Sequence, residues 1–373
     1  MIETKFDRKN PFNDLPYLPP SGEIDDDADI LKKLVSSSRA LSSVNINIMR
    51  LPNPYMLVNT ITLQEAKNST EIENIFTTED ELYKAVSDNK SEEKADLAVK
   101  EVLRYREALW AGYHAFKETK ILDLQSVLSI FRQIKNTTSG IRPPQANVVI
   151  KRGQSELRPG EIIYTPPRGN DIVEQLMDNL LSYLNDDIKY PTDPLLKMCI
   201  AHYQFEAIHP FQDGNGRTGR ILNLIYLVKC GLLNQPVLYL SKYIITNKAD
   251  YYFNLGSVTQ MGSWKNWILF MLDAVENTAV LTNNLINDIL DQMDSTLKHG
   301  KSKISWYTKE VNEAIFSQPY IKPKVIGNVL GRTSRTTLTK RMEELVSAKV
   351  LTPKRDGSEV YYLNDDLIRI LAG

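Results

Sequence analysis

The 373-residue sequence has only two cysteines, Cys199 and Cys230, no long apolar run and almost no net charge. Two cysteines are too few for a disulfide framework or a cysteine-rich zinc site, and they favour a reducing compartment. The longest apolar run, about 221–228, is shorter than the ~18–20 residues of a membrane helix. A formal charge of −1 argues against overall attraction to nucleic acid or anionic lipid. We therefore expect a soluble, cytoplasmic protein with no membrane partner.

The chain is longer than one hydrophobic core usually serves, so two or three domains are expected. Residues 5–24 are rich in proline and predict an extended arm, after which helical spacing of apolar residues dominates. The segment 139–169 interrupts this spacing with two β-branched runs, 148–150 and 162–165, which predict a β-hairpin. The sequence therefore predicts a mainly α fold that contains one hairpin.

The last 70 or so residues have a pattern of their own. Residues 298–303, with several lysines around a glycine, predict a linker. Three helices are then expected at 309–317, 324–330 and 334–348, followed by a strand pair at 350–363 around an Asp-Gly turn. This is the order of a winged helix. Its basic residues lie on and before the third helix, where a DNA-reading helix would be, but a protein partner explains them equally well. They are Arg332, Arg335, Lys340 and Arg341.

The run from His209 to Arg220, His-Pro-Phe-Gln-Asp-Gly-Asn-Gly-Arg-Thr-Gly-Arg, gathers residues that bind phosphate. Closely spaced glycines before a helix predict a nest of backbone N–H groups that attracts anions. Arg217 and Arg220 are three positions apart and can reach one phosphate chain. Asp213 offers a single carboxylate, which suits Mg²⁺, and His209 can act as a base near neutral pH. Together they predict phosphoryl or nucleotidyl transfer to a hydroxyl.

Two other interpretations of these glycines fail. Gly214 to Gly219 satisfies G-x-G-x-x-G, but the segment before it is helical in pattern and no acidic residue follows at about 20 positions, as a dinucleotide fold requires. A Walker loop would need lysine at Arg220 and serine or threonine at Ile221. Zinc-ligand spacing such as H-E-x-x-H is absent from the sequence.

The run matches every fixed position of the motif H-x-F-x-(D/E)-G-N-G-R-x-x-R and so resembles the Fic (Fido) family, over residues 50–260 or so. The resemblance implies a helical Fic core with the hairpin as a flap. It also implies ATP as substrate, Mg²⁺ as cofactor, and transfer of AMP to a Ser, Thr or Tyr hydroxyl of a target protein, with release of diphosphate. The chain itself is a further candidate target.

By this resemblance His209 is the catalytic base and Asp213 the metal ligand, while Arg217 and Arg220 hold the β- and γ-phosphates. The edge strand of the flap would clamp the target by main-chain hydrogen bonds. Tyr251 and Tyr252 are placed like adenine-pocket tyrosines, although a core aromatic pair remains the alternative. The flap residues are Ile162, Ile163, Tyr164 and Thr165, and the remaining ATP-binding residues are Gly214, Asn215, Gly216, Thr218 and Gly219.

A second segment, Ser69-Thr-Glu-Ile-Glu73-Asn74, resembles the family's inhibitory motif (S/T)-x-x-x-E-(G/N). A Glu73 carboxylate paired with Arg220 would occupy the cation meant for the γ-phosphate. Because the motif precedes the core, the resemblance is to the self-inhibited class. Ser69, Glu73 and Asn74 are therefore the predicted inhibitory residues, and Glu73 is counted with the ATP site.

These interpretations divide the chain into an N-terminal helical region with the inhibitory helix (1–95), a Fic catalytic domain with the helices after it (96–300) and a winged-helix domain (303–373). Two alternatives remain open. The same pocket could remove AMP or transfer a related group, or the protein could be a DNA-binding regulator whose Fic core senses nucleotide. The oligomeric state, a homodimer included, is also left open.

Overall fold

The structure, a computed structural model, describes residues 6–21, 24–51, 54–88, 96–152, 160–331 and 334–372. Helices dominate and the sheets are small and antiparallel, so the predicted mainly α class is confirmed. Before the C-terminal unit the helices are α1 (Ala28–Met49), α2 (Pro54–Ile72), α3 (Glu79–Asp88), α4 (Leu97–Thr119), α5 (Leu124–Lys135), α6 (Ile172–Asn185), α7 (Pro194–Ile208), α8 (Asn215–Lys229), α9 (Leu240–Thr246), α10 (Lys248–Met261) and α11 (Trp264–Lys303).

Helix α7 lies at the centre of this bundle. It begins where the Asp193 carboxylate accepts a hydrogen bond from the Leu195 N–H and Pro194 occupies the first turn, both favourable at a helix start. Every residue from Leu195 to Ile208 is buried, including the polar ones. The helix ends at His209, whose φ of 51° turns the chain away from the helix axis. This turn delivers His209 and the glycine-rich run to the start of α8.

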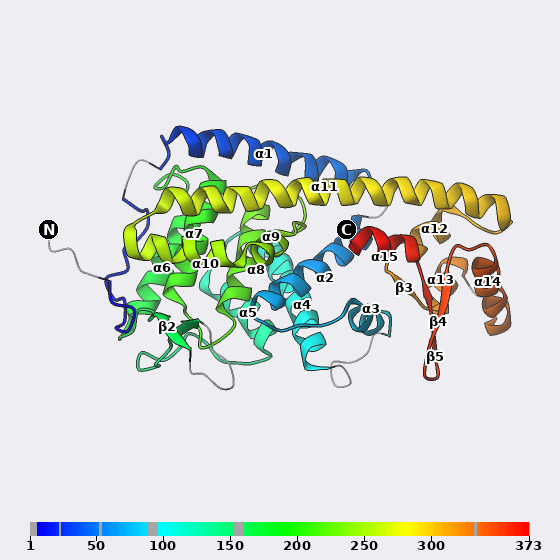
Figure 1. Ribbon diagram of the computed structural model, residues 1–373, viewed down its shortest axis with the longest axis horizontal. Helices are drawn as coiled ribbons and strands as arrows, with labels where there is room; N and C mark the ends of the chain where they lie inside the picture. Colours follow the sequence, from blue (N-terminus) through cyan, green and yellow to red (C-terminus); the bar gives the residue numbers. More distant parts are fainter. Residues whose placement is uncertain are drawn as a thin grey trace.

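A long pair of helices runs along one side of the molecule (Figure 1). Helices α1 and α11 run in the same direction, and their contacts recur along their length: the Ser37 hydroxyl donates to the Leu272 carbonyl (3.0 Å) and the Asn47 amide to Asn283 (2.9 Å). At about 1.5 Å per residue, the 40 residues of α11 extend roughly 60 Å. No helix in the described ranges combines the length and apolarity of a membrane span.

The predicted hairpin is present with shifted ends. Strand β1 (Ile150–Arg152) pairs antiparallel with β2 (Glu161–Tyr164), so residues 148, 149 and 165 lie outside the strands. The turn between them, residues 153–159, lies outside the described residues. The proline-rich arm runs beside β2: the Phe12 N–H donates to the Thr165 carbonyl (3.0 Å), and the Phe6 ring stacks on Tyr164.

The C-terminal unit has the predicted order of three helices followed by a strand pair. Strand β3 joins the pair to give the sheet order β3-β5-β4, and neither β3 nor the last helix was predicted. The Asp-Gly turn joins β4 to β5, with Gly357 at φ 57°. Arg332 lies outside the described residues. The elements are α12 (Lys309–Ile315), β3 (Tyr320–Ile321), α13 (Pro323–Leu330), α14 (Arg335–Ser347), β4 (Thr352–Asp356), β5 (Glu359–Leu363) and α15 (Asp365–Ala372).

The predicted linker at 298–303 is wrong, because these residues form the last turns of α11. The C-terminal unit packs directly on them: the His299 imidazole meets the Ala348 carbonyl (2.7 Å), and the Asn312 amide donates to the Met293 carbonyl (3.0 Å). Gly300 marks close packing, since a Cβ there would lie 2.5 Å from the Tyr307 ring. A glycine between lysines suggested flexibility, whereas it allows an aromatic ring to contact the helix backbone.

We expect Gly300→Ala to lower stability by about 1–3 kcal/mol, the usual cost of forcing a methyl group into a packed site. Alanine is the better helix former by about 1 kcal/mol, so a flexible or exposed residue 300 would give the opposite sign. Thermal unfolding of the full chain measures the change. Exposed Lys301→Ala in the same turn is the control, and a Gly300→Ala protein as stable as this control would contradict the packed joint.

Candidate functional site

The glycine-rich run forms a tight turn in front of α8. Gly214 has φ 83°, a conformation that favours glycine. The Asn215 side chain closes the turn by accepting from the Phe211 N–H (2.8 Å) and donating to the Phe211 carbonyl (2.9 Å). The Phe211 ring stacks on Phe131, 3.9 Å between centroids. The Thr218 hydroxyl donates to the Gly214 carbonyl (2.8 Å). These contacts fix the first N–H groups of α8 in the geometry of an anion nest.

His209 is held at the end of α7 by its backbone and by one ring nitrogen. Its carbonyl accepts from the Arg142 guanidinium (2.8 Å), and its Nδ1 lies 3.3 Å from the Glu206 carbonyl. Because a carbonyl only accepts, Nδ1 carries the proton and the Nε2 lone pair is available to a substrate. Burial lowers the pKa of His209 to about 4, so the imidazole is neutral at pH 7.

Asp213 lies at the exposed edge of the nest. Its Oδ1 accepts from the Gly214 N–H (2.6 Å) and its Oδ2 pairs with the Lys135 ammonium (2.5 Å). Burial raises the pKa of Asp213, but the hydrogen bond and charge of Lys135 outweigh this, and the pKa lies below its usual value. The side chain is 66% exposed. Asp213 is therefore an ionised carboxylate that an incoming cation can reach.

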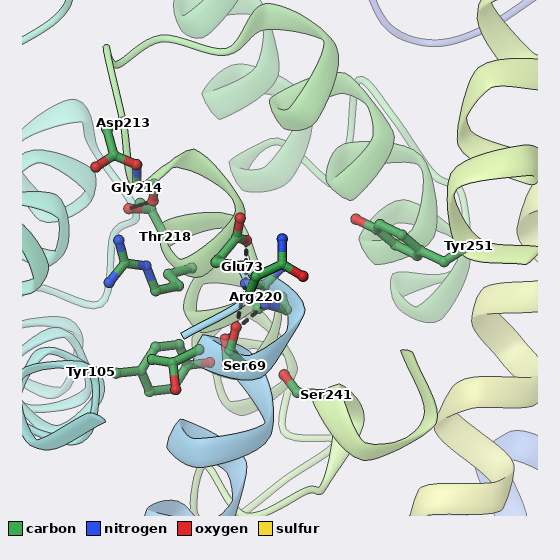
Figure 2. A network of polar contacts seen from close by, with 12 residues as sticks. Ser69, Glu73, Tyr105, Asp213, Gly214, Thr218, Arg220, Ser241 and Tyr251 are labelled. Carbon is green, nitrogen blue, oxygen red and sulfur yellow. Dashed lines mark hydrogen bonds and ion pairs between the residues drawn. The ribbon is translucent and has the colours of Figure 1, made fainter. Parts of the chain in front are cut away.

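Arg220 projects from α8 toward the end of α2 and meets two of the predicted inhibitory residues (Figure 2). Its Nη2 donates to Glu73 Oε1 (2.7 Å) and to the Ser69 carbonyl (2.9 Å), and its Nε donates to the Ser69 hydroxyl (2.8 Å). Asn74, at φ 62°, accepts from Lys248 of α10 (3.0 Å) and fixes the turn after α2. The pairing of Glu73 with Arg220 that the motif predicts is present.

Arg217 points the other way, toward α4. Its guanidinium forms an ion pair with Glu101, its side chain is 2% exposed, and its Nε is buried without a hydrogen-bond partner in the described ranges. The two arginines of the motif therefore contact carboxylates on different helices. In this conformation Arg217 contributes positive charge beneath the nest, whereas Arg220 faces the side on which Glu73 lies.

Two glycines allow the close approaches in this region. A Cβ on Gly216 would lie 2.5 Å from Glu73 Oε1, and a Cβ on Gly219 would lie 2.9 Å from Glu206 Oε1. Glu206 is buried, and in the part of the chain that the structure describes its Oε1 has no hydrogen-bond partner. Burial raises the pKa of Glu206 to about 7, although Arg220 acts to lower it. Gly216 therefore makes room for the Glu73 contact, and Gly219 lets α7 and α8 pack closely.

The predicted adenine-pocket tyrosines differ in their surroundings. Tyr251 is 2% exposed, and its hydroxyl lies 3.0 Å from His202 Nε2 within an aromatic cluster with Trp267. Tyr252 is 37% exposed, so it has surface available to a ligand, and its raised pKa reflects burial and the nearby Glu73 charge. Tyr251 has the contacts of a core residue.

The flap residues also divide into two pairs. Ile162 and Ile163 are half-buried on β2. Tyr164 is buried and its hydroxyl donates to the Ala207 carbonyl (2.9 Å), two residues before His209, while the Thr165 hydroxyl donates to the Arg8 carbonyl (2.7 Å). The strand is thereby anchored beside the end of α7, which leaves residues 161–163 as the segment that could pair with a target.

Comparison with known protein families agrees with this architecture. Residues 31–114 match the Fic/DOC family N-terminal region, residues 116–227 the Fic/DOC family, and residues 289–367 the C-terminal domain of SoFic-like protein adenylyltransferases. The chain belongs to the Fic/DOC family. The resemblance carried by the His209–Arg220 motif is thus confirmed.

The curated relatives of this Fic protein match only part of the chain. Protein adenylyltransferase fic-1 of Caenorhabditis elegans is 30% identical over 152 residues, 41% of this chain and 28% of its own length. Protein adenylyltransferase Fic of Aedes aegypti is 28% identical over 151 residues, 39% of this chain and 29% of its own length. The chain therefore spans less than a third of these relatives.

Solved structures share the fold of this Fic protein. A Fic family protein from Desulfovibrio desulfuricans G20 superposes with a TM-score of 0.57 at 22% identity, covering 93% of this chain and 98% of that one. Fic-1 of C. elegans gives 0.51 at 19% identity, covering 68% and 73%. The first match includes nearly the whole chain, so the fold of the C-terminal unit is shared as well.

Several residues of the Fic site carry no sequence signal. The Arg142 guanidinium donates hydrogen bonds to the carbonyls of Ile208 (3.1 Å) and His209, and so fixes the end of α7. Glu101 pairs with Arg217, and Lys135 with Asp213. Each is an isolated charge in a segment whose pattern indicates only helix or loop, and each reaches the motif from more than 60 positions away. No local spacing rule finds such partners.

We expect the His209 imidazole to show no protonation between about pH 8 and 5.5, because its pKa of about 4 keeps it neutral, whereas an ordinary histidine titrates near pH 6.5. Nitrogen-15 NMR of the imidazoles measures this, with His209→Gln to assign the signal. Free N-acetylhistidine in the same buffer is the reference. A His209 midpoint near 6.5 would contradict the buried, neutral base.

Proposed function

We propose that this Fic protein is an adenylyltransferase that transfers AMP from ATP to a hydroxyl of a target protein. The observation that carries the proposal is the neutral His209, with its Nε2 lone pair available, directly in front of the nest at the start of α8. The names of the curated relatives, protein adenylyltransferase, agree with this chemistry.

In the proposed reaction the hydroxyl oxygen of the target attacks the α-phosphorus of ATP and the bond to the β-phosphate breaks. The hydroxyl proton moves to His209 Nε2, and diphosphate leaves. A triphosphate in the nest places negative charge near the imidazole, which raises the pKa of His209 and makes it a stronger base once ATP is bound. The nest supplies N–H donors for the phosphate oxygens.

Asp213 fits the role of the Mg²⁺ ligand. Its carboxylate is ionised and exposed at the edge of the nest. The described residues hold no group of three or more metal-ligating side chains, which suits Mg²⁺, since it takes one or two protein carboxylates together with phosphate oxygens and water. When bound, Mg²⁺ would neutralise charge on the phosphates. Asp213 would then exchange its Lys135 partner for the cation, which would free the Lys135 ammonium to pair with phosphate.

Glu73 is proposed to hold this activity low. Its carboxylate occupies the side of Arg220 that would otherwise meet the γ-phosphate, and Gly216 lets it lie against the start of α8. Two anions cannot share one buried guanidinium without strong repulsion. ATP then binds without its γ-phosphate on Arg220, in a pose unsuited to in-line attack.

The C-terminal unit has two exposed basic residues, Arg335 and Lys340, whereas Arg341 lies over the Trp306 ring. A gel shift with a salt titration decides between a DNA partner and a protein partner for this unit.

Incubation of the purified protein and a cell lysate with α-labelled ATP and Mg²⁺ tests the transfer. We expect label on a lysate protein or on the chain itself, and we expect His209→Ala to abolish it because no base then takes the hydroxyl proton. Equal labelling by His209→Ala, or none by any variant, would contradict the proposal. Label lost from a pre-modified target would instead favour AMP removal.

We expect Glu73→Gly to raise labelling by about tenfold or more. A charge-assisted hydrogen bond contributes about 1.5–3 kcal/mol, and 1.4 kcal/mol is a factor of ten. The Glu73 side chain is 35% exposed, which favours the lower end of that range. Glu71→Gly on the same helix is the matched control, because Glu71 pairs with Lys67 and not with Arg220. Unchanged labelling by a folded Glu73→Gly protein would remove the inhibitory role.

A further inference from the structure

Residues of α2, α3, α4 and the segment that leads into β3 line a pocket away from the nest. Figure 1 shows these elements next to the C-terminal unit. Its volume is about 450 Å³, within the ~300–1,000 Å³ of small-molecule sites. Leu63 of α2, Tyr83 and Val86 of α3, Trp110 of α4 and Pro319 before β3 provide an apolar and aromatic lining. The size and lining suit a flat organic molecule of one or two rings.

The charged residues that line this pocket are one cation, Arg106, and one carboxylate, Glu107. Arg106 of α4 lines it, and in the described part of the chain the guanidinium has neither an ion pair nor a hydrogen bond. Burial lowers the pKa of Arg106, and the charge of its chain neighbour Glu107 offsets this only in part. Glu107 accepts a hydrogen bond from Gln133 (3.2 Å). A partly buried cation without a counter-ion favours an anionic ligand.

Trp110 lies in the same wall. Its indole Nε1 is buried and has no acceptor among the described residues, although the ring packs against Tyr113 and His114. A buried indole N–H usually has a hydrogen-bond partner. Arg106 and Trp110 lie four positions apart on α4 and so face the same side of the helix. Because the Trp110 N–H is buried, Trp110 offers its ring to the pocket and Arg106 is the donor of this pair that a ligand can reach.

We propose that this pocket binds an aromatic carboxylate, with the carboxylate on Arg106 and the ring against the apolar lining, to which the Trp110 ring belongs. A carboxylate matches the planar donor fork of a guanidinium and carries a single negative charge. Arg106 is the one cation among the lining residues that the structure describes. A dianionic phosphate would be left half-compensated there, which is why a carboxylate is favoured.

The position of the pocket makes its occupant an effector rather than a substrate. Leu63 is ten positions before Glu73, about 15 Å along the direction of α2. On the other side, Asp80 of α3 accepts from Tyr320 (2.5 Å) and Lys354 (2.6 Å), which ties this wall to the C-terminal unit. A ligand that joins these walls stiffens α2 against the rest of the molecule. Its effect on AMP transfer rests on the function proposed above, whereas its binding does not.

Calorimetry on the full chain tests the site with 2-naphthoate as the probe and benzoate and indole-3-acetate as alternatives. We expect saturable binding of at least one acid, weakened about tenfold or more by Arg106→Gln, since the carboxylate then loses its charged partner. Neutral 2-naphthamide should bind as weakly to the wild type as the acid does to Arg106→Gln. Exposed Lys117→Gln, on the same helix, is the matched control and should change nothing.

Other outcomes would overturn the proposal. The absence of saturable binding by all three acids up to about 10 mM would overturn it, because that concentration reveals sites far weaker than functional ones. Equal affinity of acid and amide, or displacement of the probe by ATP with no effect of Arg106→Gln, would do so too. If Arg106→Gln fails to fold, Val86→Phe, which fills the pocket and keeps the cation, should abolish binding. Binding without any labelling activity would count against the adenylyltransferase and leave the pocket in place.

Discussion

The buried guanidinium of Arg220 is the constraint on which the rest of the site depends. Its side chain is 2% exposed, and a buried cation is costly unless charge and hydrogen bonds compensate it. Compensation comes from the end of α2, where Ser69 contributes a hydroxyl and a carbonyl and Glu73 a carboxylate. The N-terminal region is therefore bound to the catalytic helices through this cation. The inhibition proposed for Glu73 and the stability of the fold would depend on the same contacts.

Arg220 also affects the pKa values of two carboxylates that it does not contact, Glu65 and Glu206. Burial raises the pKa values of Glu65 and Glu206 to about 7, and in both cases Arg220 opposes the rise. Glu65 is satisfied by hydrogen bonds from Ser241 and Tyr105, whereas Glu206 Oε1 has no partner. The positive charge of Arg220 therefore lowers the pKa values of two buried carboxylates on the helices around it.

The sequence predicts what is encoded locally. His209, Asp213, Gly214 and Arg220 lie within one run, so their proximity follows from chain connectivity, and Asp and Pro residues mark the start of α7. Glu73 was found only through its own motif. The grip of Arg142 on His209 depends on long-range packing without a periodic signal, and the packing of the arm against β2 has the same origin. The prediction of a linker at 298–303 was wrong for the same reason. The role of Gly300 follows only from the position of the Tyr307 ring against it, which the local sequence does not show.

The two partners of the central ion pair, Arg220 and Glu73, differ in exposure, and the more exposed Glu73 is the one with room to move. Glu73 is 35% exposed at the end of its helix, while Arg220 is 2% exposed and held by Ser69 through two further hydrogen bonds. Rotation of Glu73 into solvent leaves Arg220 in place and opens the space over Gly216, where glycine provides no side chain to fill it. The vacated position borders the N-terminus of α8, which attracts anions. A phosphate can therefore replace the carboxylate without any rearrangement of the core.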